Sequence, residues 1–97
     1  RVSEVQLNIP GKFQLSQNYP NPFNPMTTIS YQLPEAAHVV LSIYNLKGQL
    51  VAELVNEYKN AGIYNIDWNV KSLSSGIYVY ELRSGDFSEV RKCMLLR

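Results

Sequence analysis

Few side chains in this chain could carry out catalysis or bind a metal. Its 97 residues include one histidine, His38, and one cysteine, Cys93, which lie far apart in the sequence. A nucleophilic enzyme needs a nucleophile, a base and a group that orients the base, and a structural zinc site needs about four closely spaced ligands. The five glycines are isolated, unlike those of a phosphate-binding loop. The sequence therefore predicts no catalytic residue, no metal ligand and no cofactor.

Charge and cysteine usage exclude further classes of protein. Nine lysines and arginines and eight acidic residues give a net charge of +1, and these charges are scattered along the chain. A nucleic-acid-binding face needs several clustered cations, so we expect no nucleic-acid partner. A single cysteine excludes an internal disulfide. Because only Arg91 and Lys92 are near enough in sequence to activate it, Cys93 is predicted to be an apolar filler.

The distribution of proline divides the chain into two parts. All five prolines lie at or before Pro34. Residues 1–12 contain one alternating stretch, Val5–Ile9, and a Pro-Gly turn signal, so they are interpreted as a linker or an edge strand. The chain opens at Arg1 without an initiator methionine, and we expect it to be a fragment of a longer polypeptide. Residues 13–97 are predicted to form one domain.

Apolar residues alternate with polar ones through most of that domain, which is the period of β-strands. The expected strands are separated by turn signals, and the one at 49–58 is predicted to contain a bulge: 27–33, 38–45, 49–58, 63–68, 77–83 and 87–96. No segment has helical length and period. The sequence predicts an all-β fold, an immunoglobulin-like antiparallel β-sandwich of about seven strands. Its core is predicted to contain Ile29, Tyr31, Leu41, Ile43, Trp68 and Tyr80.

The proline-rich segment, residues 17–25, has the sequence QNYPNPFNP. Its prolines exclude helix and favour extended backbone. Two interpretations remain open at this point: a stiff connector whose Tyr19 and Phe23 pack on the core, or a recognition loop.

Several motifs follow one another in a specific order along the chain. The first half contains the proline-rich segment, then Thr27–Tyr31, and then Val39, Leu41, Ile43 and Gly48 in the next strand and turn. The second half contains these residues: Ala61, Gly62, Tyr64, Trp68, Ser75–Tyr78, Leu82, Gly85 and Arg91–Arg97. In this order the motifs resemble a known family, the type A C-terminal sorting domains of proteins exported by the type IX secretion system. The family is also similar to the immunoglobulin-like module of the flagellar hook-capping protein. One departure is the loop at 69–75, where the family often has a longer loop with Asp or Asn and Gly.

The resemblance implies a non-catalytic domain that directs an upstream cargo domain through the outer membrane. The implied partners are the outer-membrane translocon and a sortase that removes the domain when cargo is anchored on the cell surface. The implied location is secreted or cell-surface, reached through the periplasm. Residues expected to carry the signal are Gly76, Tyr78, Gly85, Lys92, Met94, Leu95, Leu96 and Arg97.

Strand addition is the expected mode of recognition, because an edge or terminal strand offers unpaired backbone groups. Lys92 interrupts an apolar face, and it is interpreted either as an outward recognition charge or as a gatekeeper against aggregation. The alternative function is an accessory carbohydrate-binding or spacer module of a secreted hydrolase, in which Tyr19, Tyr44 and Tyr58 would contact the sugar. A weak homodimer through an edge strand is also left open.

The lack of clustered ligands leads to a prediction about metal removal. A chelator is expected to leave the melting temperature of the purified chain unchanged, because no structural metal contributes to its folding free energy. Thermal unfolding followed by circular dichroism, with and without chelator, checks this. A clear fall in melting temperature, restored by added zinc or calcium, contradicts it.

Overall fold

The computed structural model describes residues 10–97, so the expected strand or linker at Val5–Ile9 lies outside the described residues. The described part folds into strands joined by short turns and loops. Their bounds are β1 Gln14–Leu15, β2 Met26–Leu33, β3 Ala37–Tyr44, β4 Leu50–Lys59, β5 Gly62–Asn69, β6 Gly76–Ser84 and β7 Phe87–Leu95.

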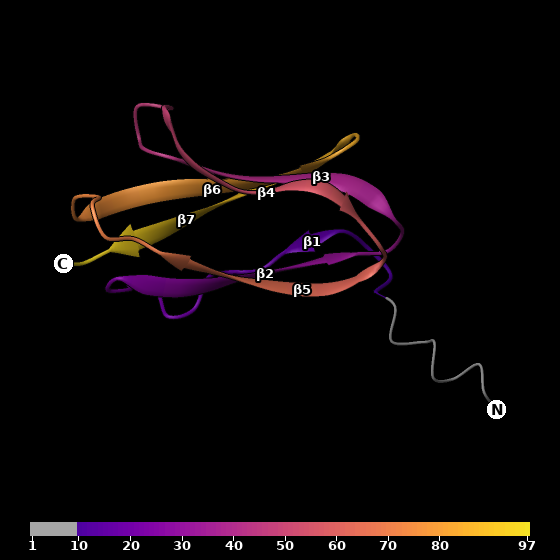
Figure 1. Cartoon of the computed structure of the whole chain (residues 1–97), viewed down its shortest axis with the longest axis horizontal. Helices are drawn as coiled ribbons and strands as arrows, with labels where there is room; N and C mark the ends of the chain where they lie inside the picture. Colours follow the sequence, from indigo (N-terminus) through magenta and orange to yellow (C-terminus); the bar gives the residue numbers. More distant parts are fainter. Residues whose placement is uncertain (1–9) are drawn as a thin grey trace.

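The strands form two sheets that pack face to face (Figure 1). One sheet has the order β1-β2-β5 and the other the order β4-β3-β6-β7, and neighbouring strands are antiparallel throughout. The chain crosses between sheets from β2 to β3, from β4 to β5 and from β5 to β6. The all-β, immunoglobulin-like sandwich predicted from the sequence is confirmed. β6 lies between β3 and β7 in its sheet, and its first residues are apolar on both faces.

The β3–β4 hairpin leaves the plane of its sheet at the end nearest its turn. Pairing between the two strands shifts register after Leu41 and again after Ile43, which confirms the predicted bulge. Bulges increase the local twist of a strand pair. In Figure 1 the hairpin accordingly rises away from the sheet above β6. Its turn is closed by Asn45, whose side-chain oxygen accepts hydrogen bonds from the backbone N–H of Lys47 and Gln49.

The core lies between the two sheets and is built from the inward residues of every strand. Alternation along each strand sends one set of side chains inward and the other outward. Among the buried residues are Ile29, Tyr31, Leu41, Ile43, Trp68 and Tyr80. The ring centroid of Trp68 lies 5.5 Å from that of Phe23 and 6.2 Å from that of Tyr78. Trp68 therefore joins the proline-rich segment to β6 across the core.

Of the two aromatic residues that the connector interpretation packs on the core, Phe23 packs there and Tyr19 does not. Tyr19 is 81% exposed and Phe23 only 2% exposed. The backbone of Tyr19 pairs with Thr28, donating and accepting one hydrogen bond each. In such extended backbone, neighbouring side chains point to opposite sides, and the inward position is taken by Asn18. The tyrosine is thereby turned to solvent.

Replacing Trp68 by alanine tests the core. We expect the free energy of unfolding to fall by about 3–5 kcal/mol, because a large aromatic side chain with contacts to both sheets leaves a cavity. Urea unfolding followed by circular dichroism measures the loss. The matched control is Ile63→Ala, at a residue that is 63% exposed on β5 and is expected to change stability by less than about 0.5 kcal/mol. A loss below about 1 kcal/mol for Trp68→Ala would contradict the assigned core.

Candidate functional site: the last strand and the proline-rich segment

The proline-rich segment lies along the outer edge of β7. Phe23 donates its backbone N–H to the carbonyl of Met94 at 2.9 Å and accepts a hydrogen bond from the N–H of Leu96 at 3.0 Å. The two chains run parallel at this bridge. Residues from the start of the domain therefore pair with the residues that close it.

Two polar side chains of the segment extend this cover. The Oδ1 atom of Asn21 accepts a hydrogen bond from the N–H of Met94 at 2.9 Å. The Nε2 atom of Gln17 donates to the carbonyl of Lys92 at 2.7 Å. Asn and Gln side chains reproduce the acceptor and donor of a peptide group, so each replaces one partner of a missing strand.

Asn18 holds the segment in place from within. Its Nδ2 atom donates to Thr27 Oγ1 at 2.9 Å and to the carbonyl of Pro20 at 3.2 Å. The Thr27 hydroxyl donates to the same carbonyl at 2.8 Å. Asn18 and Thr27 are almost completely buried. Buried polar groups require such partners, so this network fixes the path of the segment.

The Tyr80 hydroxyl ties the segment to the middle of the four-stranded sheet. It donates to the carbonyl of Ser16 and accepts from the N–H of Asn18, both at 2.7 Å. Tyr80 is fully buried in β6, and burial raises its pKa to about 12. The tyrosine therefore stays neutral and keeps both bonds over the physiological pH range.

Side chains of β7 satisfy the backbone of β1. Arg91 Nε donates to the carbonyl of Leu15 at 2.7 Å. Glu89 Oε1 accepts a hydrogen bond from the backbone N–H of Leu15 at 3.0 Å. Arg91 and Glu89 also form an ion pair with 3.4 Å between their nearest atoms. The edges of β1 and β7 on this side of the sandwich are thus joined by side chains.

Arg97 binds the loop between β5 and β6. Its guanidinium donates to the carbonyls of Val70, Lys71 and Leu73, and its backbone N–H donates to Ser75 Oγ. An arginine carries five N–H donors in a rigid plane, which suits several carbonyls at once. The structure therefore gives Arg97 a positioning contact inside the domain.

These contacts correct the expectation that the end of β7 offers unpaired backbone groups for strand addition. Both backbone groups of Met94, the carbonyl of Lys92 and the N–H of Leu96 already have partners in the proline-rich segment. The sequence did not reveal this cover, because the two segments lie at opposite ends of the chain. A partner strand could add at these residues only by displacing residues 17–23.

The predicted signal residues do not all lie together. Gly76 pairs with Leu95 and Tyr78 with Cys93, so the start of β6 and the end of β7 are adjacent. Gly85 lies in the β6–β7 turn, at the other end of these strands, about 30 Å away at the rise of a β-strand. Seven of the eight candidates thus share one end of the sandwich: Gly76, Tyr78, Lys92, Met94, Leu95, Leu96 and Arg97.

Exposure separates those candidates further. Leu95 and Tyr78 are buried, and the Tyr78 hydroxyl donates to the carbonyl of Ser74 at 2.8 Å. Lys92 and Met94 are exposed on the outer face of β7, on the same face as the 53% exposed Val90. Lys92 therefore lies on an outer face, and the buried apolar face of β7 is the one that carries Cys93 and Leu95.

Cys93 is packed into this buried face. It is 2% exposed, and burial raises its pKa to about 11. A thiol with a raised pKa is protonated at neutral pH and is a poor nucleophile. This agrees with the expectation of an apolar filler.

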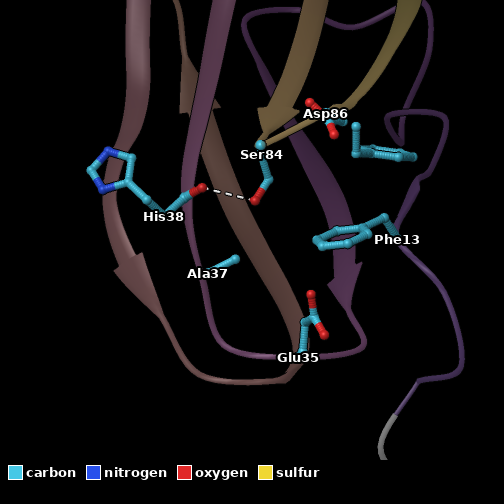
Figure 2. Close-up of a pocket in the computed structure, with 8 residues that line it drawn as sticks. Phe13, Glu35, Ala37, His38, Ser84 and Asp86 are labelled. Atoms are coloured by element: carbon cyan, nitrogen blue, oxygen red, sulfur yellow. Dashed lines mark hydrogen bonds between the residues drawn. The ribbon is translucent and has the colours of Figure 1, made fainter.

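A shallow cleft of about 650 Å³ lies at the opposite end of the sandwich, but its geometry does not support catalysis. Figure 2 shows the His38 ring turned away from Phe13 and from the carboxylates of Glu35 and Asp86. His38 Nε2 lies 2.7 Å from Asn56 Oδ1, and the Ser84 hydroxyl donates to the backbone carbonyl of His38. The serine and the imidazole ring therefore do not form a nucleophile–base pair.

Residues 10–97 contain no group of three or more histidine, cysteine, aspartate or glutamate side chains placed to hold a metal ion. Over the same residues, no helix has the length and apolar character needed to cross a membrane.

The tyrosines proposed for carbohydrate binding are spread over the molecule. Tyr58 pairs with His38 at one end of β3, whereas Tyr44 is at the other end. His38 and Tyr44 are six steps apart along β3, or about 20 Å at the rise of a β-strand. Tyr19 is on the proline-rich segment, where its backbone pairs with Thr28 of β2, in the other sheet. The three rings cannot stack on one sugar.

Comparison with known families identifies the domain. A family model described as "Secretion system C-terminal sorting domain" matches residues 17–95. The chain belongs to this family. The match begins at the first residue of the proline-rich segment and ends at the last residue of β7, so the segments that pair at the β7 edge bound the sorting domain. The family is non-catalytic.

The fold of this sorting domain is similar to part of PorZ, described as an essential bacterial surface component of the type-IX secretion system of Porphyromonas gingivalis. The TM-score is 0.60 at 19% sequence identity, and the similarity covers 88% of this chain. The chain spans only 11% of the length of PorZ. Similarity at this level of identity shows the fold alone. Among curated protein sequences, none matches this chain.

Sequence reasoning missed the polar side chains that organise the sorting domain. In the sequence, Gln17, Asn18 and Asn21 stand out only as parts of a motif, yet each makes a hydrogen bond that fixes the segment. The sequence feature that could have revealed them is the repetition of amide side chains between prolines. There the backbone cannot form a regular ladder of hydrogen bonds, so side chains must supply the partners.

Replacing Tyr80 by phenylalanine tests how the segment is held. The Ser16 carbonyl and the Asn18 N–H would lose their partner, so we expect a loss of about 1–3 kcal/mol in the free energy of unfolding near neutral pH. The matched control is Tyr58→Phe on the exposed face of β4, which should have little effect.

Comparing the parent chain with Tyr80→Phe also predicts how the free energy of unfolding depends on pH. Tyrosine titrates near 10 when unfolded, and Tyr80 near 12 when folded, so the native state holds this proton more tightly. Its contribution is complete below pH 10 and is lost as the pH rises from about 10 to about 12. The stability difference between the parent and Tyr80→Phe should therefore shrink over that range. A difference that stays constant from pH 8 to 12 would contradict the buried, bonded hydroxyl.

Proposed function

We propose that this domain directs the protein to which it is attached through the type IX secretion system and across the outer membrane. Membership of the sorting-domain family carries the proposal. The closed pairing of the proline-rich segment with β7 supports recognition of a folded domain, because its last residues are fixed on the sandwich.

The translocon and a sortase are the partners in this proposal. Residues 1–12 would link an upstream cargo domain to the sandwich. We place sortase cleavage on the cargo side of Phe13, because a cut within the sandwich would break its packing. Phe13 is already held by stacking on Phe87, with 5.0 Å between ring centroids. Cleavage there would release the intact sandwich and leave the cargo free for anchoring on the cell surface.

The proposal predicts export of a reporter. A folded fluorescent or enzymatic reporter is fused in front of the 97-residue chain, behind an N-terminal export leader, in a bacterium that has type IX secretion. The reporter should reach the cell surface or the medium. In the same strain without a functional outer-membrane translocon, it should remain folded in the periplasm.

The control replaces the domain by an unrelated immunoglobulin-like sandwich of similar size. Its reporter should stay in the periplasm, because fold alone does not define a sorting signal. Export of the control to the same extent, or retention of the parent fusion in a strain that exports its own cargo, would contradict the proposed function.

A further inference from the structure

An apolar groove lies on the outer face of the four-stranded sheet, at the end where the signal candidates meet. Its floor is formed by Ile77 and Met94, which pair across β6 and β7 and are 36% and 37% exposed. Two hollows of about 300 and 200 Å³ flank Ile77, and this residue lines both of them. The two hollows therefore adjoin at the side chain of Ile77, and the groove is made of both.

The β3–β4 hairpin forms one wall of the groove. The bulges in the β3–β4 pairing allow this hairpin to rise above the start of β6, as Figure 1 shows. Leu46, at its tip, is 67% exposed and lines the larger hollow together with Lys47. The surface is therefore concave, with Leu46 of the hairpin on one side and the apolar floor of β6 and β7 on the other.

The floor of the larger hollow includes bare backbone. Gly76 has a φ of +152°, and a Cβ built on it would meet no atom within 4 Å. Only glycine adopts this backbone without strain, and it leaves space above the start of β6. A partner can therefore approach the backbone here closely.

The rim of the groove is positively charged. Lys47 lines the larger hollow and Lys92 the smaller one, and no carboxylate lines either. Neither lysine forms an ion pair within residues 10–97. The acidic residues of this outer face are Glu53 and Glu81. Both pair with Ser42, which is two residues further from the hairpin turn than Tyr44. The local charge is thus complementary to a carboxylate.

We propose that this groove binds a protein segment in which an apolar side chain lies next to a carboxylate. The apolar side chain would pack between Leu46 and Ile77, and the carboxylate would lie near Lys47 or Lys92. The inference rests on the proposed function and names the surface by which the export machinery recognises the folded domain. It also assigns the outward charge of Lys92 to partner recognition. A flat lipid surface fits this site poorly, because the hairpin wall makes it concave.

The first test compares Ile77→Asp with Ile63→Asp in the reporter fusion with the full chain. Both residues are exposed on outer sheet faces, but Ile63 lies on β5 of the other sheet. The exported fraction should fall about tenfold or more for Ile77→Asp, as for a central anchor of an interface, and stay at the parent level for Ile63→Asp. Melting temperatures of the purified chains verify folding. If Ile77→Asp fails to fold, Leu46→Asp at the exposed hairpin tip replaces it.

The second test reverses charge on the rim. Lys92→Glu should reduce export, whereas Lys12→Glu, the same change at the opposite end of the domain, should not. Binding of the purified chain to phosphatidylglycerol vesicles is measured by co-sedimentation, and no binding that depends on Ile77 or Lys92 is expected. Such vesicle binding would overturn the inference in favour of a membrane contact.

The outcomes separate the two proposals. Export of the parent fusion together with equal export of the groove variants would overturn the groove and leave the sorting function standing. Equal loss in the Ile63→Asp and Lys12→Glu controls would also overturn it, because the effect would not be local. Failure of the parent fusion itself to leave the periplasm would contradict the sorting function.

Discussion

The backbone hydrogen bonds between Phe23 and the end of β7 are the constraint on which the rest of this domain depends. They require the proline-rich segment to lie along the sheet edge, and proline suits that task because it favours extended backbone and cannot extend a ladder itself. Phe23 then has its ring against Trp68, in the core of the sandwich. One residue thus links edge protection to core packing.

This arrangement changes how a sorting signal at the end of a chain can be understood. The last strand is built into the fold: its inner face is core, and its outer edge is paired from Lys92 to Leu96. What remains accessible is the outer face, with Lys92 and Met94 beside Ile77. Recognition through side chains on a rigid face is compatible with export of a folded domain, whereas strand addition at this edge would first require the proline-rich segment to move.

The sequence predicted the elements well and their lateral contacts poorly. Period-two alternation located the six strands from β2 to β7, and β-branched and aromatic residues marked the core, because burial on one face leaves a regular pattern. Contacts such as Asn21 to Met94, or Arg97 to the 70–73 carbonyls, have no such pattern, since they join single polar groups far apart in the chain. The groove was not predicted for a related reason. The sequence indicated a bulge in β4, but it did not indicate the direction in which the bulge turns the hairpin.

Hydrogen exchange of backbone amides on β7 tests most directly whether the proline-rich segment covers this edge. The amides of Met94 and Leu96 bond to Asn21 and Phe23, whereas that of Val90, on the same side of the strand, has no such partner within residues 10–97. Measured by NMR on the folded chain, Met94 and Leu96 should exchange far more slowly than Val90, at rates close to those of paired amides within β6. Exchange of all three at the same fast rate would show an open edge and would contradict this account.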